Sequence, residues 1–259
     1  MIIDPRAAEI VPGDVSGGAN TSHTILIGAL ATLLDALPSG ASESDYMRSA
    51  LEENVLGKQT HEARRRTYRY LKELYLLRPD ALLFRALRDL WSDDEEARPL
   101  LAGLCALARD PVFRASSRAI IRSRPGGVLT SGMLAEMVGE SFPLSYREST
   151  LATIGRNLFS SWEQTGHLAK GRPPLKVRSA ATCTPANLAY ALLLGHLEGA
   201  RGQALFETLW AKVLDASTAQ LFDLAFVASQ HGLLELRRAG GVTEVGFHEL
   251  LRPFAEESP

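Results

Sequence analysis

Apolar residues recur at intervals of three and four along most of this chain, which predicts helices in preference to strands. Between residues 21 and 123, capping residues, prolines and glycines divide this pattern into about six helices. Helix starts are predicted at Thr21 or Ser22, at Ser42 with Asp45 three residues later, and at Asp110 before Pro111. Residues 1–20 show no periodicity. We therefore expect a flexible arm over residues 1–20 and a helical bundle over residues 21–123.

The sequence Arg-Pro-Gly-Gly at residues 124–127 is the clearest break in the chain, and it predicts a domain boundary. After it come a short helix from Thr130 or Ser131, a long helix from Ser145, and a hairpin near residues 167–178. A short helix, a turn, a long helix and a hairpin follow one another in this order in a winged helix.

The last third of the chain repeats this design. Helices are expected from Thr184, over residues 202–214 and from Ser217, and a second hairpin is expected near residues 233–246, around two adjacent glycines. The sequence thus predicts a mainly α fold with two small β-hairpins and no central sheet. Residues 128–259 are expected to be winged-helix-like, either as two units (128–182 and 183–259) or as one elaborated domain.

The helix expected from Ser145 to Gln164 is amphipathic. Its apolar face comprises Leu151, Ile154, Leu158 and Trp162. The opposite face carries short hydrogen-bonding side chains and one arginine, so it can approach an anionic backbone and still reach base edges. The alternative is a helix used only for packing or protein contacts, because a fold does not determine a function. The candidate DNA-contacting residues here are Ser149, Thr153, Arg156 and Asn157.

Basic residues also gather on the hairpin that follows this helix. If its two strands pair around Gly171 to Pro174, four cations project together. A winged helix binds nucleic acid through a helix followed by a basic wing. The candidate residues of this wing are Lys170, Arg172, Lys176 and Arg178.

A second basic site is expected on the helix that begins after Thr60. Clustered lysines and arginines can neutralise phosphates, although a charge run is more often an ordinary solvated helix face. Its candidate residues are Lys58, Arg65, Arg66, Arg69 and Lys72, and a further basic run comprises Arg114, Arg118, Arg122 and Arg124. Because the chain of 259 residues has a net charge of −2, any binding of nucleic acid must come from such local clusters.

Motifs for catalysis and metal binding are not found in the sequence. The six histidines do not occur at metal-ligand spacing, and no nucleophile elbow, phosphate-binding loop or dinucleotide motif is present. The two cysteines, Cys105 and Cys183, form no disulfide framework, which is typical of a reducing cytoplasm. No apolar run approaches the roughly 20 residues of a bilayer span. We expect a cytoplasmic protein with no enzyme activity, cofactor, metal or membrane association.

Three segments, however, resemble a known family. The segments SALEENVLGKQTHEARRRTYRYLKELYLL (49–77), YRESTLATIGRNLFSSWEQTGHL (146–168) and LFDLAFVASQHGLLELRR (221–238) are similar to the BrxA family of BREX phage-defence systems. The resemblance covers roughly residues 45–250. It implies a small, non-enzymatic component of a BREX system that binds DNA, with a helical half similar to the NusB antitermination fold, which binds RNA. The matching motif residues are Leu56, Gly57, Lys58 and Thr60, together with Arg156, Asn157 and Trp162.

Two functions follow from these patterns. In the first, the protein binds double-stranded DNA largely without sequence specificity, through the basic helix and the winged helix, and RNA binding is possible. In the second, it is an interaction module that holds other BREX proteins together without touching DNA.

Overall fold

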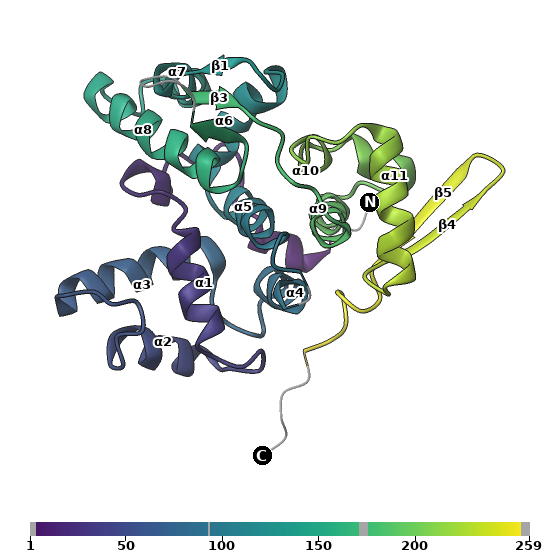
Figure 1. Cartoon of the computed structure of the whole chain (residues 1–259), viewed down its shortest axis with the longest axis horizontal. Helices are drawn as coiled ribbons and strands as arrows, with labels where there is room; N and C mark the ends of the chain where they lie inside the picture. Colours follow the sequence, from purple (N-terminus) through teal and green to yellow (C-terminus); the bar gives the residue numbers. More distant parts are fainter. Residues whose placement is uncertain (1–3, 93, 171–175, 255–259) are drawn as a thin grey trace.

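Two helices that are apolar on nearly every side form the centre of the molecule (Figure 1). All residues from 100 to 108 are buried in helix α5 (Arg98–Arg109), and α9 (Pro185–Leu197) is buried over residues 186–195. A helix of this kind must be covered on all sides. The two helices pack together and come from opposite sides of the boundary predicted at residues 124–127. One continuous core therefore crosses that boundary.

The computed structural model describes residues 4–92, 94–170 and 176–254. In its first part, capping residues begin helices where the sequence predicts. Ser42 and Asp45 form a reciprocal capping box, and Thr60 and Asp110 accept hydrogen bonds from the first turns of their helices. Tyr46 and Trp91 are fully buried. The elements are η1 (Pro5–Glu9), η2 (Ala19–Thr21), α1 (Ile27–Asp35), α2 (Glu43–Leu51), α3 (His61–Tyr75) and α4 (Leu82–Trp91).

Residues 4–20, the described part of the expected flexible arm, pack against the helices. The Glu9 carboxylate accepts hydrogen bonds from the amides of Leu82 and Leu83, 2.8 Å each, at the start of α4. Ile10 and Asn20 are buried. These contacts join distant segments of the chain, so a helical or strand period could not reveal them. Helix α1 begins at Ile27, later than expected, because η2 and the left-handed residue Leu26 precede it.

The middle of the chain forms a winged helix. Its elements are α6 (Pro111–Arg122), β1 (Val128–Leu129), α7 (Ser131–Ser141), α8 (Glu148–Gln164), β2 (Leu168–Lys170) and β3 (Lys176–Arg178). The three strands form an antiparallel sheet in the order β1-β3-β2. The hairpin near residues 167–178 is thus confirmed. Strand β1 was not expected, because two residues are too short to show a period of two.

The last third has the related order that the sequence predicts. It comprises α9, η3 (Gly202–Glu207), α10 (Leu209–Lys212), α11 (Thr218–Gln230), β4 (Glu235–Ala239) and β5 (Val242–Gly246). Strands β4 and β5 pair around Gly240 and Gly241, both with positive φ, as a two-residue hairpin turn requires. A single helix was expected over residues 202–214, but Thr208 adopts an extended conformation and starts α10 anew, with Trp210 buried behind it.

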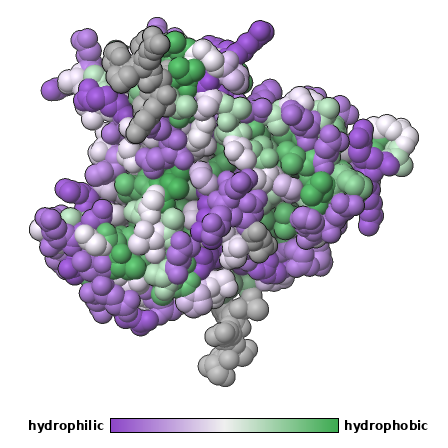
Figure 2. All heavy atoms as spheres, in the orientation of Figure 1, coloured by the Kyte–Doolittle hydropathy of each residue, from purple (hydrophilic) through white to green (hydrophobic). Residues whose placement is uncertain are grey.

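The chain is therefore mainly α, with small antiparallel strand pairs in the described residues. None of the described helices has the length and apolar character needed to cross a membrane. The surface in Figure 2 is largely hydrophilic at its outer edges, and apolar side chains show at the end where β1 and α7 lie.

Candidate nucleic-acid interface

Helix α8 lies directly on α7 because a glycine stands at their crossing. A Cβ at Gly155 would lie 2.2 Å from the Ser131 carbonyl oxygen and 3.0 Å from the Ala135 Cβ, so no larger residue fits without movement. The predicted apolar face is confirmed for Ile154, Leu158 and Trp162, which are fully buried, whereas Leu151, the fourth residue of that face, is half-buried.

Trp162 fixes the orientation of α8 relative to α6. Its indole Nε1 donates a 2.8 Å hydrogen bond to Ser116 Oγ, and its ring packs against Phe113 with centroids 4.5 Å apart. Since this face is turned to α6, the opposite face of α8 points away from α6.

That outward face of α8 carries Ser149, Thr153 and Arg156. Ser149 and Arg156 are exposed, and Thr153 is half-buried. The Arg156 guanidinium donates a 2.9 Å hydrogen bond to Thr153 Oγ1, and no carboxylate of the described residues lies within ion-pair distance of it. An exposed cation without a carboxylate partner is available to an anionic ligand.

Asn157, predicted to contact DNA, holds η2. Its Nδ2 donates a 3.1 Å hydrogen bond to the Asn20 carbonyl oxygen, and one turn later Ser161 Oγ donates to Asn20 Oδ1 at 2.8 Å. The amide at the edge of α8 thus has a partner within the chain. Asn157 is half-buried beside η2 and its Nδ2 has a structural role, so its predicted contact with DNA stays a prediction.

Asp110, identified from the sequence only as a helix cap, anchors η2 from the other side. The carboxylate accepts hydrogen bonds from the Phe113 amide at 2.9 Å, the Asn20 amide at 2.8 Å and Asn20 Nδ2 at 3.0 Å. Burial raises the pKa of Asp110, and these hydrogen bonds act against that rise. Gly18, with φ of +130°, lies so close that a Cβ would be 2.4 Å from Asp110 Oδ1.

Helix α3 contacts the opposite side of η2. The His23 ring lies 4.3 Å from the Tyr70 ring, and the Arg69 guanidinium is 5.1 Å from the Tyr70 centroid. Burial lowers the pKa of His23, and the positive charges of Arg66 and Arg69 lower it further. These two arginines therefore lie near η2, and in Figure 1 η2 (purple) lies between α8 and α3.

The five basic residues predicted at this second site differ in their surroundings. Arg65, Arg66 and Arg69 are exposed, whereas Lys58 is half-buried. Lys72 is exposed and forms an ion pair with Glu43 of α2. An exposed pair of this kind contributes little, so Lys72 can exchange its partner for another anion.

On the wing, the structure corrects the prediction for Arg178. Lys170 at the end of β2 pairs with Lys176 at the start of β3, but their side chains, and Arg172 entirely, lie outside what the structure describes. Arg178 is only 1% exposed and cannot reach a phosphate. It stands at the root of the hairpin opposite Leu168, where the wing meets the core.

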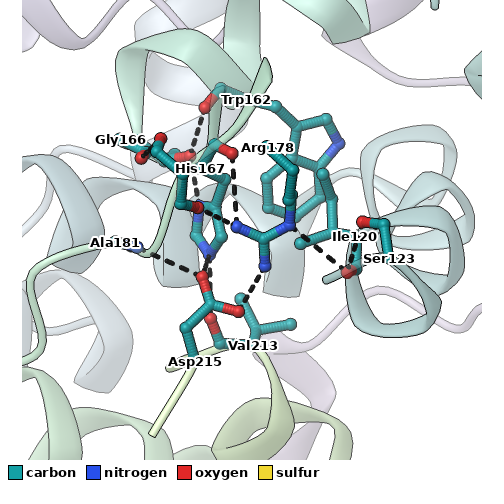
Figure 3. A network of polar contacts seen from close by, with 11 residues as sticks. Ile120, Ser123, Trp162, Gly166, His167, Arg178, Ala181, Val213 and Asp215 are labelled. Carbon is teal, nitrogen blue, oxygen red and sulfur yellow. Dashed lines mark hydrogen bonds and ion pairs between the residues drawn. The ribbon is translucent and has the colours of Figure 1, made fainter. Parts of the chain in front are cut away.

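A buried polar network surrounds Arg178 and joins three parts of the chain (Figure 3). Its guanidinium donates to the Ile120 carbonyl in the last turn of α6 at 3.4 Å and to the His167 carbonyl at 3.2 Å. It also forms an ion pair with Asp215, in the loop before α11. A buried cation needs such partners, and the carbonyl end of a helix is one of them.

His167 completes this network. Its Nε2 lies 2.8 Å from the Val213 carbonyl oxygen and its Nδ1 lies 2.7 Å from Thr165 Oγ1. A carbonyl only accepts, so Nε2 carries a hydrogen. Burial lowers the pKa of His167 to about 4, although Asp215, 3.6 Å away, acts to raise it. The network links the wing to the last third of the chain.

The sequence did not reveal Asn20, His167 or Asp215 as structural polar residues. Asn20 and Asp110 are 90 positions apart, and Arg178 and Asp215 are 37 apart, so no local spacing connects them. Within the described parts of the chain, no three His, Cys, Asp or Glu residues are grouped so that they could hold a metal ion. Comparison of the chain with protein-family models, curated proteins and solved structures finds no match.

Proposed function

We propose that the protein binds duplex DNA, largely without sequence specificity, with α8 and α3 against the phosphate backbone. The observation that carries this proposal is the position of Arg156 on the outward face of α8, across η2 from the exposed arginines of α3. A winged helix presents the same face of its third helix to nucleic acid.

Weak sequence preference follows from the side chains available on α8. Ser149, Thr153 and Arg156 suit phosphates, and Asn157, whose amide could read adenine, is engaged with Asn20. Phosphate contacts fix position without reading sequence. The basic side chains on either side of η2 also provide the local positive charge that a chain of net charge −2 needs.

The resemblance of residues 49–77, 146–168 and 221–238 to the BrxA family supports a place for this activity in a BREX phage-defence system. There the protein would act as a non-enzymatic DNA-binding component that also contacts other BREX proteins. RNA is a further possible ligand, because the resemblance extends to a NusB-like bundle.

The alternative function, an interaction module without DNA contact, is favoured by the second winged-helix-like unit. Helix α11 has no lysine or arginine, and its exposed side chains include Asp223 and Phe226, the latter 58% exposed. Such a surface suits a protein partner better than a phosphate backbone.

A salt titration separates the two functions. Binding of a random-sequence duplex is measured by fluorescence anisotropy over a range of KCl concentrations. If wild type binds, replacing Arg66 and Arg69 with serine should weaken binding and lower the slope of log affinity against log salt by up to about two units, since each phosphate contact contributes about 0.9.

The matched control replaces Lys212 and Arg237, exposed cations in the last third, with serine. It removes the same charge and should leave the slope unchanged. A third variant, Arg156→Ser, tests α8 separately. If wild type shows no salt-dependent binding, or if all three variants bind equally well, DNA contact at this face is excluded and the interaction module is favoured.

A further inference from the structure

A groove of about 280 Å³ lies between α6, β1 and α7. Its apolar lining comprises Ala119, Val128, Leu129, Met133 and Met137. Val128 and Met133 are 50% and 44% exposed, so two large apolar side chains face the solvent at this place. Figure 2 shows apolar surface at this end of the molecule.

The apolar lining of this groove is suited to an apolar side chain of another molecule. Methionine side chains are flexible and polarisable, so they adapt to ligands of different shape. Strand β1 forms one wall and lies at the edge of its sheet. A contiguous exposed apolar surface with polar residues at its rim is typical of a protein-interaction site.

Arginines follow one another at the end of α6, and one of them, Arg122, lines the groove. Arg118 and Arg122 are one helical turn apart on α6, and Arg124 follows the helix. All three are exposed, and none forms an ion pair with a described residue. Arg118 donates hydrogen bonds to the Met137 carbonyl and to Ser141 Oγ. This side of α6 therefore carries three arginines without an ion-pair partner among the described residues, and the groove lining also contains one acidic residue, the exposed Glu136.

Arg114, the first residue of the same run, is by contrast engaged with other parts of the chain. It is half-buried, donates a hydrogen bond to the Val11 carbonyl, lies over the Trp210 ring and faces Glu198 at 3.9 Å. Arg114 is engaged within the chain, whereas the later arginines of the run have no ion-pair partner among the described residues. The unpaired positive charge of α6 therefore lies toward its C-terminal end, next to the groove.

The position of the groove separates it from the face assigned to DNA. The buried face of α8 is turned to α6 through Trp162 and Ser116, so Arg156 points away from α6. A phosphate backbone also gains nothing from the apolar lining of Val128 and Met133. A polypeptide with both an apolar side chain and carboxylates matches the lining and the rim together.

We infer that this groove binds a segment of a partner protein in which a bulky apolar residue is flanked by aspartate or glutamate. The apolar residue enters between Met133 and Val128, and the carboxylates pair with Arg122 and Arg124. This inference does not depend on the proposed binding of DNA.

The test begins with a displayed library of random 16-residue peptides selected on the full chain. Enriched peptides are synthesised with a fluorescent label, and their affinities are measured by anisotropy. We expect the enriched peptides to share an apolar residue next to acidic ones. Met133→Gln should lower their affinity at least about tenfold, because it removes the apolar contact. The double variant Arg122→Glu with Arg124→Glu should separately lower it at least about tenfold, because it removes the ion pairs.

The control is Arg65→Glu with Arg66→Glu, which makes the same change of charge on α3 and should leave peptide affinity within about twofold of wild type. Melting temperatures show that each variant is folded; the replaced side chains are exposed, so large shifts are not expected. The inference is overturned if no such peptides are enriched, or if the groove variants bind them as tightly as wild type. A loss of duplex DNA affinity in the Arg122 and Arg124 variant, without loss of peptide binding, would also overturn it and assign these arginines to phosphate.

Discussion

Arg178 and Arg156 show how differently two arginines of one winged helix are used. Arg178 is enclosed by carbonyl groups and the Asp215 carboxylate, and removal of that carboxylate would leave a buried charge uncompensated. Arg156 is exposed and bonded only to Thr153 among the described residues. The first arginine stabilises the wing, and the second remains available to a ligand.

His167 makes the stability of the fold depend on pH. The folded chain holds it neutral with a pKa of about 4, whereas an unfolded histidine has a pKa of about 6.5. As pH falls below 6.5 the unfolded chain takes up a proton that the folded chain does not, so stability is present above this pH and is lost towards pH 4. From pH 7 to pH 5 wild type should lose about 2 kcal/mol more than His167→Gln.

Urea unfolding at the two pH values, followed by circular dichroism, measures this difference. The other histidines with lowered pKa, His23 and His196, are present in both proteins and cancel in the comparison. Equal pH dependence of the two proteins would show that His167 is not held neutral by the fold.

At the scale of elements, the crossing of α7 and α8 depends on Gly155. Replacing it with alanine places a Cβ 2.2 Å from the Ser131 carbonyl oxygen and should destabilise the chain by about 2 kcal/mol, as overpacking does. The displaced α8 should also bind duplex DNA less tightly if α8 is a contact.

Gly139→Ala is the matched control for this change. It lies in α7, where a Cβ would make an ordinary 3.5 Å contact with Leu151, and alanine favours a helix by up to about 1 kcal/mol over glycine. Unfolding free energies should move in opposite directions in the two variants. A Gly155→Ala protein as stable as wild type would mean that the helices can separate without cost.

Several helix starts were predicted correctly, whereas α8 begins at Glu148 and not at Ser145, and its N-cap residue Arg147 makes no side-chain capping bond. Ser42, Thr60, Asp110 and Thr184 all cap helices in the structure, because a cap is a local hydrogen bond that neighbouring residues specify. Strand β1 was missed, since its partner β3 lies nearly 50 residues away.

The candidate interface was predicted less completely. The polar face of α8 follows from a helical period, and its exposure at Ser149 and Arg156 agrees with the sequence. The burial of Arg178 and the covering of Asn157 do not follow from any period, because contacts with α6, Asp215 and η2 cause them. Long-range packing thus decides which polar residues of a face remain free.

For the whole molecule, the shared core of α5 and α9 determines how the chain unfolds. Because each helix covers the other, residues 1–126 and 127–259 would each expose a large apolar surface if separated. We expect the full chain to unfold in urea as one cooperative transition, and each fragment alone to lack one. A fragment with native helix content and cooperative unfolding would show instead that the halves are independent domains.

Each third of the molecule also contains one tryptophan, whose fluorescence can report on the packing around it. Trp91 lies in α4, Trp162 in the winged helix and Trp210 in α10, and these are the three tryptophans of the chain, all at most 1% exposed. Buried indoles emit at shorter wavelength than solvated ones, so the folded chain should fluoresce in the blue part of the tryptophan range. Variants that retain one tryptophan each would then report the loosening of each third separately, without any attached dye.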